Sequence, residues 1–195
     1  SILSKMFANP RLSAHMELGS RGQKILVHRI AHYYIKCLDF IPYFRSDRDG
    51  VKKSEDYKEY DLFRPAEPFV AAINSAAFYF YWQVFFYAFK AGKECVENFP
   101  VSDHAKGPVQ SSLTTLCKEL MADLKKHKCR LLAKYAATGA VEYDQFYPRI
   151  SKPIMDRIDS VLGPTYGFTD EELDFVINYD VKYRMGGSDD EDGDE

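Results

Sequence analysis

The chain has 195 residues, of which 46% are hydrophobic and 28% charged, and this composition predicts a soluble protein with a packed core. Residues 1–10 lack the apolar run of a secretory signal peptide, and the apolar segment 78–89 is shorter than the roughly 20 residues that cross a bilayer. Secreted and membrane-spanning classes are therefore disfavoured. We expect a cytoplasmic protein and, because it begins with Ser1, a piece of a longer chain.

The first part of the chain favours strands. Residues 23–40 alternate apolar and polar side chains and predict one or two strands. Residues 45–60 are polar and predict a loop, with Asp49-Gly50 as a turn signal, and residues 61–64 predict a short strand.

A strongly aromatic helix is predicted next, over residues 69–90. Pro65 and Pro68 precede it, and we expect Gly92 to stop it. Its aromatic side chains surround the helix, so most of them should be core, while Lys90 and Lys93 near its end could reach phosphate groups. The aromatic residues are Phe78, Tyr79, Phe80, Tyr81, Trp82, Phe85, Phe86, Tyr87 and Phe89.

The clearest predicted helix covers residues 109–135, where leucines recur at helical spacing and lysines lie between them. Thr138-Gly139 would end it, and residues 141–147 look extended. Two more helices are predicted over residues 152–162 and 169–178. The second of these opens with a capping-box sequence, in which Thr169 caps the helix and Glu172 reaches back to it.

Strands followed by helices, without regular alternation, predict an α+β fold: a strand-rich N-terminal part and a helical C-terminal part with one long amphipathic helix. We divide the chain into residues 1–107, a helical segment 108–186 and an acidic tail 187–195, which should be disordered. The net charge is −3, but six acidic residues lie in this tail. The remainder therefore carries a formal +3, which is compatible with nucleic-acid binding.

The cysteines and histidines do not form a metal-binding pattern. No CxxC pair is present, and Cys117 and Cys129 would lie about 18 Å apart along one helix, too far for a disulfide. We expect these two, with Cys37 and Cys95, to be reduced. His28 and His32 are four residues apart in a predicted strand with no third ligand near, so a structural or DNA-facing role is expected.

The polar segment 43–58 is the main candidate for ligand contact. It holds five cationic and four acidic residues, so a solvated loop without function is one interpretation of it. In the other interpretation, lysines contact phosphates and arginines contact guanine edges. With the two lysines after the aromatic helix, the candidate DNA-binding residues are Arg45, Arg48, Lys52, Lys53, Lys58, Lys90 and Lys93.

Several segments resemble the C-terminal target-recognition region of Type II and IIG-like restriction–modification adenine-N6 DNA methyltransferases and of BREX-type adenine methylases. The longest is YDQFYPRISKPIMDRIDSVLGPTYGFTDEELDFVINYDVKYR, residues 143–184. The segments YYIKCLDFIPYF, KKSEDYKEY, INSAAFYFYWQVFF and NFPV are similar to the recognition region and the elements that follow it. The resemblance covers most of residues 28–186, in the expected order, and departs from the pattern at AFKAGKECV.

The resemblance implies a DNA target-recognition module that acts with a catalytic domain of the same parent chain in restriction–modification or phage defence. The parent would use S-adenosylmethionine, and the partner would be double-stranded DNA. This chain lacks a Gly-rich cofactor loop and an Asn/Asp-Pro-Pro-aromatic loop: Asn9-Pro10 is followed by Arg11, and Asn98-Phe99-Pro100 does not fit. We therefore expect no catalytic and no cofactor-binding residue here.

Two other functions stay open at this level. The chain could be a protein-interaction module, in which the long helix and the two C-terminal helices dock a partner or the catalytic domain. It could also be an independent enzyme, although no nucleophile or acid–base set is identifiable from the sequence.

Overall fold

The computed structural model describes residues 1–16, 22–30, 35–63, 65–86, 90–101, 107–135 and 139–180. Its α+β fold confirms the predicted class. The elements in chain order are α1 (Ile2–Phe7), the 3-10 helix η1 (Leu12–His15), β1 (Gln23–His28), β2 (Cys37–Leu38), β3 (Phe44–Ser46), β4 (Gly50–Val51), β5 (Tyr57–Leu62), α2 (Glu67–Ile73), α3 (Ala76–Phe85), α4 (Lys93–Glu97), α5 (Gly107–His127), β6 (Cys129–Tyr135), β7 (Gly139–Gln145), α6 (Pro148–Tyr166) and α7 (Asp170–Asn178).

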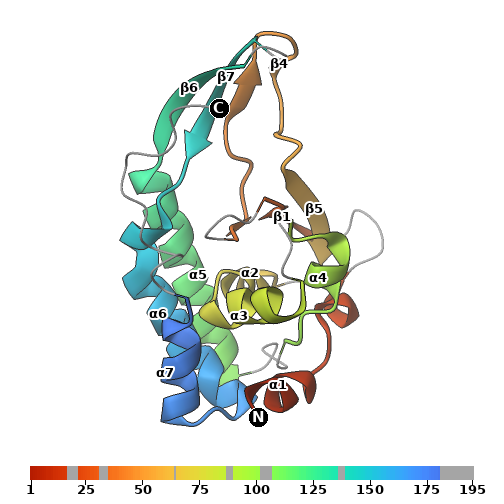
Figure 1. Ribbon diagram of the computed structural model, residues 1–195, viewed down its shortest axis with the longest axis vertical. Helices are drawn as coiled ribbons and strands as arrows, with labels where there is room; N and C mark the ends of the chain where they lie inside the picture. The colour runs from red at the N-terminus through yellow and green to blue at the C-terminus, as the bar shows by residue number, and fades with distance from the viewer. Residues whose placement is uncertain are drawn as a thin grey trace.

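The strands form two antiparallel sheets. A three-stranded sheet has the order β2-β1-β5, and a four-stranded sheet has the order β4-β3-β7-β6. In Figure 1 the four-stranded sheet forms one end of the long axis of the molecule, and α5, α6 and α7 lie along one side below it. We call this four-stranded sheet the projecting sheet. It joins strands from the first and last thirds of the chain.

One hydrophobic core runs from Met6 in α1 to Val176 in α7. At its centre lies α2, whose residues from Pro68 to Ile73 are all buried, and the first seven residues of α3 are buried as well. The core includes side chains from both sides of position 107, so helices and strands of the two parts share one interior.

The prediction of one continuous helix over residues 69–90 is wrong. The helix is broken between α2 and α3, where Ser75 adopts an extended backbone and its side chain caps α3 by accepting from the Phe78 N–H. The side chain of Asn74 meanwhile exchanges two hydrogen bonds with the backbone of Cys37 in β2. The side chains of Asn74 and Ser75 thus bind backbone groups of β2 and α3, and these hydrogen bonds compete with a continuous helix. The expected stop at Gly92 is instead the start of α4, because Gly92 caps that helix.

The prediction of a helix over residues 109–135 is also wrong at its C-terminal end. The helix α5 ends at His127, and Cys129 begins strand β6. The helix buries its leucines only as far as Leu124, whereas Leu131 and Leu132 are exposed on β6. The helical spacing of leucines in the sequence thus continues past the end of α5, into residues that do not form a helix. As a consequence Cys117 and Cys129 do not share a helix.

The polar segment 45–60 is not a loop, contrary to the prediction from its composition. It contains β3, β4 and the first part of β5, and the strand expected at residues 61–64 begins earlier, at Tyr57. All six residues of β1 pair with β5, from Gln23 opposite Leu62 to His28 opposite Tyr57. The polar composition suggested that the backbone N–H and C=O groups of this segment are bound to water. They form hydrogen bonds with neighbouring strands instead.

The C-terminal helices and the strand before them agree with the sequence. The segment expected to be extended is β7, and α6 and α7 cover the two predicted helices, α6 being longer at both ends. The helix α6 ends at Gly167, whose φ of 74° is the left-handed conformation that favours glycine. Thr169 and Glu172 form the predicted capping box at the start of α7.

Some of the predictions fall wholly or partly on residues outside the described ones: His32, residue 64 at the end of the predicted strand 61–64, the end of the aromatic segment at 87–89, Thr138 and the acidic tail 187–195. Among the described residues, no helix combines the length and the apolar character needed to cross a membrane.

Candidate nucleic-acid interface

The β3–β4 hairpin is closed by a short turn with Arg48 at its apex. Ser46 pairs with Gly50 across the hairpin, which leaves residues 47–49 as a three-residue turn. Gly50 has a φ of 70°, the conformation that such hairpin turns require next to the strand. The Ser46 hydroxyl accepts from the Asp49 N–H at 3.0 Å. The turn is therefore held from within, and Arg48 is exposed.

The end of this hairpin is fastened to the β6–β7 hairpin through Asp47. The Asp47 N–H donates to the Ala140 carbonyl at 3.0 Å, and the Ala140 N–H donates to the Asp47 carboxylate at 3.2 Å. Below this point Arg45 pairs with Glu142 and Phe44 pairs with Tyr143. These contacts place the turn that carries Arg48 beside the start of β7, at the end of the projecting sheet.

One face of the projecting sheet gathers cations from two distant segments. Directly paired residues in antiparallel strands point to the same face. Arg45 is opposite Glu142, which is opposite Leu132, so this face also carries the alternate β6 residues Arg130 and Lys134. We call it the Arg45 face. Its cations come from β3 and β6, which are more than 80 residues apart in the chain.

Arg130 is fixed on this face by a charged network around Asp144, whose side chain is almost fully buried. Lys128 and Arg130 donate to the two carboxylate oxygens at 2.6 and 2.8 Å, and the Tyr43 N–H donates at 3.1 Å. Burial alone would raise the pKa of Asp144, but these hydrogen bonds outweigh it and lower the pKa. The Arg130 guanidinium also lies over the Tyr43 ring, 3.6 Å from its centroid.

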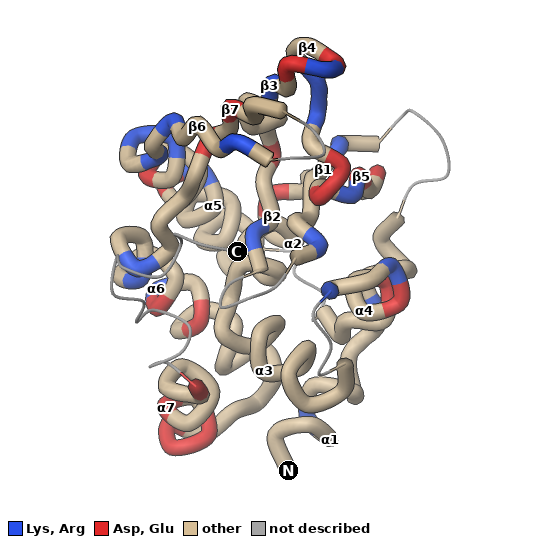
Figure 2. The backbone as a smooth tube through the Cα atoms, turned by 45° about the horizontal axis from the view of Figure 1, so that its top comes forward, with Lys and Arg blue, Asp and Glu red and all other residues tan. Residues whose placement is uncertain are grey.

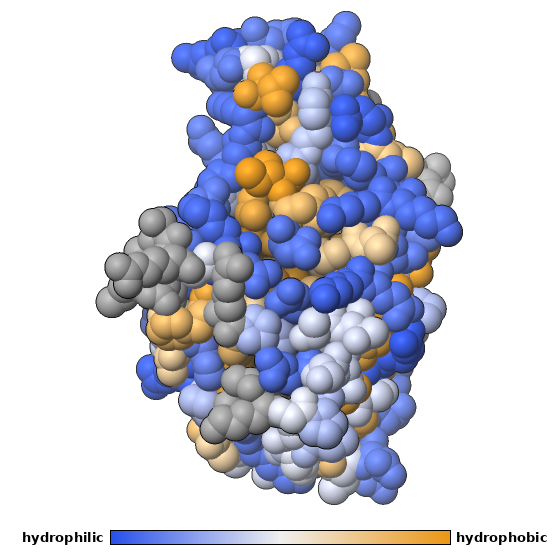
Figure 3. Space-filling model, turned by 180° about the vertical axis from the view of Figure 1, so that it is seen from behind, coloured by the Kyte–Doolittle hydropathy of each residue, from blue (hydrophilic) through white to orange (hydrophobic). Residues whose placement is uncertain are grey.

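The segments that build this end of the molecule are cationic, although the whole chain is acidic. Residues 43–53 and 128–145 contain seven Lys and Arg and four Asp and Glu, a net charge of +3. Figure 2 shows the basic and acidic positions intermixed around β3, β4, β6 and β7. In Figure 3 the narrow end of the molecule is mostly hydrophilic on the side shown, with small hydrophobic patches between the polar side chains.

Ion pairing separates these cations into two groups. Lys52 binds Asp49 at 2.8 Å, and this hydrogen bond is the main reason that the pKa of Asp49 is lowered. Lys53 binds Glu59 at 2.7 Å. In contrast, Arg45, Arg48 and Lys134 form no ion pair with any other residue that the structure describes.

The seven residues singled out in the sequence do not all lie together. Arg45, Arg48 and Lys52 belong to the β3–β4 hairpin, and Lys53 follows it. Lys58 is exposed on β5 of the other sheet. Lys90 and Lys93 lie beside and in α4, which Figure 1 shows well away from the projecting sheet, and Lys93 is 3.5 Å from Glu97.

Sequence reasoning missed Lys128, Arg130 and Lys134, because the leucine spacing assigns these residues to the polar side of a long helix. A signal for the correct structure was present in Thr138-Gly139. This turn signal stands where the segment 139–145 begins, shortly after the segment 129–135 of the same length, and such an arrangement is typical of a β-hairpin.

Ser151, Asp123 and His127 have the residue types of a catalytic triad but not its geometry. Ser151 donates to Asp123 at 2.7 Å, and His127 lies 3.1 Å from the same carboxylate. The carboxylate stands between the hydroxyl and the imidazole, so His127 is not placed to activate the Ser151 oxygen as a general base. Among the described residues, no group of three or more His, Cys, Asp or Glu side chains is arranged to hold a metal ion.

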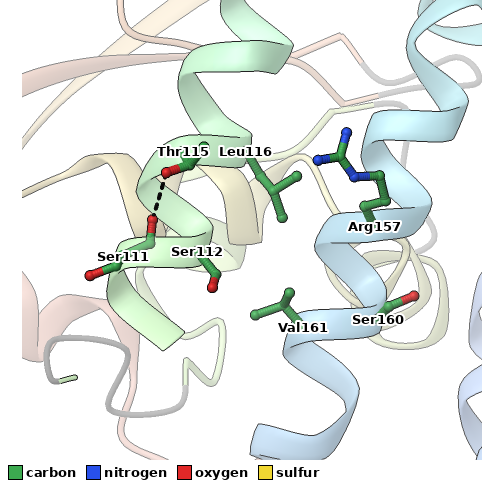
Figure 4. Close-up of a pocket in the computed structure, with 7 residues that line it drawn as sticks. All are labelled: Ser111, Ser112, Thr115, Leu116, Arg157, Ser160 and Val161. Carbon is green, nitrogen blue, oxygen red and sulfur yellow. Dashed lines mark hydrogen bonds between the residues drawn. The ribbon is translucent and has the colours of Figure 1, made fainter. Parts of the chain in front are cut away.

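A shallow groove of about 500 Å³ lies between α5 and α6 (Figure 4). Hydroxyl side chains and Leu116 line it, and Arg157 stands at its edge. The guanidinium of Arg157 is bound to Glu119 at 2.6 Å, outside the groove lining, and this pairing lowers its ability to bind an anion there. The full lining is Ser111, Ser112, Thr115, Leu116, Arg157, Ser160 and Val161.

No family model matches the chain, and neither a curated protein nor a solved structure is significantly similar to it.

Proposed function

We propose that the chain is the DNA target-recognition module of an S-adenosylmethionine-dependent adenine-N6 DNA methyltransferase. One structural observation carries the proposal: the projecting sheet brings cationic side chains from residues 45–53 and 128–134 to one end of the molecule. A positive, protruding surface suits the phosphate backbone of duplex DNA. The resemblance of residues 28–186 to recognition regions supports the same function.

The shape of the projecting sheet is compatible with groove binding. The major groove of B-DNA is about 12 Å wide and admits a two-stranded β-ribbon. The β3–β4 and β6–β7 hairpins are joined along β3 and β7, so the part suited to enter a groove is the turn with Arg48 at the free end of the sheet, where Asp47 lies beside Gly139 at the start of β7. Proteins that read DNA with β-strands likewise place strands in a groove.

Catalysis belongs elsewhere in this proposal. The methyl donor and the flipped adenine would be bound by a catalytic domain of the parent protein, for which this chain supplies target choice and DNA affinity. The biological setting we propose is restriction–modification or another phage defence in the cytoplasm.

The test is fluorescence anisotropy of a labelled DNA duplex titrated with the 195-residue chain over a salt series. We expect weak binding whose log affinity falls against log salt with a slope of roughly −2 to −5, because each phosphate contact contributes about −0.9. Arg45→Ala should weaken binding, whereas Lys118→Ala, an exposed lysine on α5, should not. No binding at low salt, or binding indifferent to salt, rejects the proposal.

A second candidate is a protein-interaction module, and one observation favours it. Phe7 in α1 and Phe85 in α3 are each about half exposed, at 48% and 47%, and their rings pack edge to face with centroids 5.2 Å apart. An exposed aromatic pair is suited to an apolar partner surface. Calorimetric titration of the chain with the methyltransferase catalytic domain tests this function. The double variant Phe7→Ser, Phe85→Ser should then no longer bind the catalytic domain, whereas its binding to DNA should be unchanged.

A further inference from the structure

The end of the projecting sheet distinguishes Arg48 from the other cations. Acidic residues flank it on both sides, yet both carboxylates accept hydrogen bonds from other residues of the sheet. Asp47 accepts from the Ala140 N–H, and Asp49 accepts from Lys52 and from the Ser46 hydroxyl. Arg48 is therefore the cation of the turn, it is exposed, and it forms no ion pair with a described residue.

The turn that carries Arg48 is also fixed by hydrogen bonds within it and to the neighbouring hairpin. Ser46 and Asp49 hold it from within, and the two hydrogen bonds between Asp47 and Ala140 fasten it to the neighbouring hairpin. A side chain that must select one base pair needs such a fixed backbone, because a bidentate contact tolerates little misplacement.

Arg45 and Lys134 are placed differently. Both lie on the Arg45 face of paired strands rather than in the turn: Arg45 is in the middle of β3, and Lys134 is opposite Ala140, one residue before the end of β6. Arg45 and the β6 strand are two strand spacings apart, about 10 Å, so cations on this face are spread over a surface instead of converging on one point. A spread of charge along a surface fits a phosphate backbone and carries no sequence information.

We infer that the projecting sheet divides DNA recognition between two sets of side chains: Arg48 enters the major groove and contacts the O6 and N7 atoms of a guanine, while Arg45 and Lys134 contact phosphates. This inference rests on the proposed function, since it names what each part of the same surface binds. Asp47 acts as a positioning residue for Arg48. The chemistry of the contact is the planar, bidentate fork that guanidinium offers and ammonium does not.

The experiment is selection of bound duplexes from a library with a randomised segment, followed by sequencing, using the 195-residue chain. Three proteins are compared: the unchanged chain, Arg48→Lys and Lys134→Gln. Arg48→Lys keeps the positive charge but removes the bidentate geometry, so it separates guanine reading from phosphate contact. Thermal unfolding of each protein confirms that the exposed substitutions leave the fold intact.

We expect the unchanged chain to select a guanine at one position of the site. Arg48→Lys should reduce that selectivity by about 5- to 150-fold at that position alone, with the salt dependence of binding unchanged. Lys134→Gln should weaken binding to all sequences alike and make the slope of log affinity against log salt shallower by about 1. It should leave the selected sequence as it was.

The inference is overturned if Arg48→Lys selects the same sequences as the unchanged chain, or if the unchanged chain binds duplexes without any base preference. The first result leaves the proposed function standing, because another side chain would then choose the sequence; the second leaves DNA binding standing but rejects target choice by this chain. Failure of the unchanged chain to bind any duplex at low salt is a different result, because it rejects the proposed function itself.

Discussion

The carboxylate of Asp159, in the middle of α6, accepts hydrogen bonds from the backbone N–H of Ala76, at the start of α3, with distances of 2.9 and 3.0 Å. Both residues are buried. The first N–H groups of a helix have no partner within the helix, and a negative charge there also interacts favourably with the helix dipole. One side chain of α6 thus stabilises the break between α2 and α3.

We predict that Asp159→Ala lowers the free energy of unfolding by about 2–4 kcal/mol, because it leaves buried N–H groups of α3 without an acceptor. Asp159→Asn should cost less, since its amide oxygen can still accept one hydrogen bond. Urea denaturation followed by circular dichroism measures the difference. Asp156→Asn, on the same helix and partly exposed, is the control and should stay within about 0.5 kcal/mol of the unchanged chain.

The Asp144 network should make stability depend on pH. The pKa of Asp144 is lowered in the folded protein, so its charged form stabilises the fold above the unfolded value of about 4. That contribution is lost as the pH falls further, through the lowered folded pKa. We expect Asp144→Asn to cost about 1–3 kcal/mol at pH 7 and progressively less below pH 4. Denaturant unfolding of both proteins at pH 7 and pH 3 checks this, and an equal cost at both values would contradict it.

The capping box of α7 should make a local contribution to stability. Replacing Thr169 with Ala removes the acceptor for the Glu172 N–H and should cost about 0.5–2 kcal/mol. For a chain of this size, that corresponds to a fall in Tm of a few degrees. Thr115→Ala is the matched control, because Thr115 lies in the middle of α5 and its hydroxyl only donates back to the Ser111 carbonyl. A Tm unchanged by Thr169→Ala would mean that the cap is dispensable.

Thiol reactivity should single out Cys129. The three other cysteines are buried, and burial raises the pKa of Cys95 and Cys117 to about 12. A buried, protonated thiol reacts slowly. We expect a disulfide reagent to modify one cysteine in the folded protein and all four in guanidinium. Cys129→Ser should leave none reactive in the folded protein, and rapid reaction of that variant would show that the core opens.

Ion pairing within the sheets should rank the cations in DNA binding. Lys53 already binds Glu59, whereas Arg45 has no such ion pair among the described residues. Under the proposed function, Arg45→Ala should therefore make the slope of log affinity against log salt shallower by about 1, and Lys53→Ala by less. Anisotropy titrations at several salt concentrations distinguish the two. A larger effect of Lys53→Ala would place the DNA on the Glu59 side of the molecule.

Some features of this protein follow from the sequence alone, because they depend on residues close together in the chain. The capping box of Thr169 and Glu172 spans one helical turn, and its geometry is local. The apolar spacing of α5 up to Leu124 and the concentration of aromatic residues in α3 likewise predicted buried helical faces correctly. The succession of strands and helices was sufficient for the α+β class.

Other features depend on partners that are distant in sequence. The segment 129–135 carries the helix-forming residues Arg, Leu, Ala and Lys, yet it is a strand because all seven of its residues pair with β7. The β3 strand, in turn, exists through pairing with Tyr143, Glu142 and Val141, almost 100 residues away. The candidate interface is of this second kind. Arg45 and Arg48 could be named from the sequence as candidate DNA-binding residues. Lys134 becomes a candidate only because strand pairing places its side chain on the same face of the sheet as Arg45. Strand pairing is a non-local interaction, and it overrides the weaker local preference of the chain.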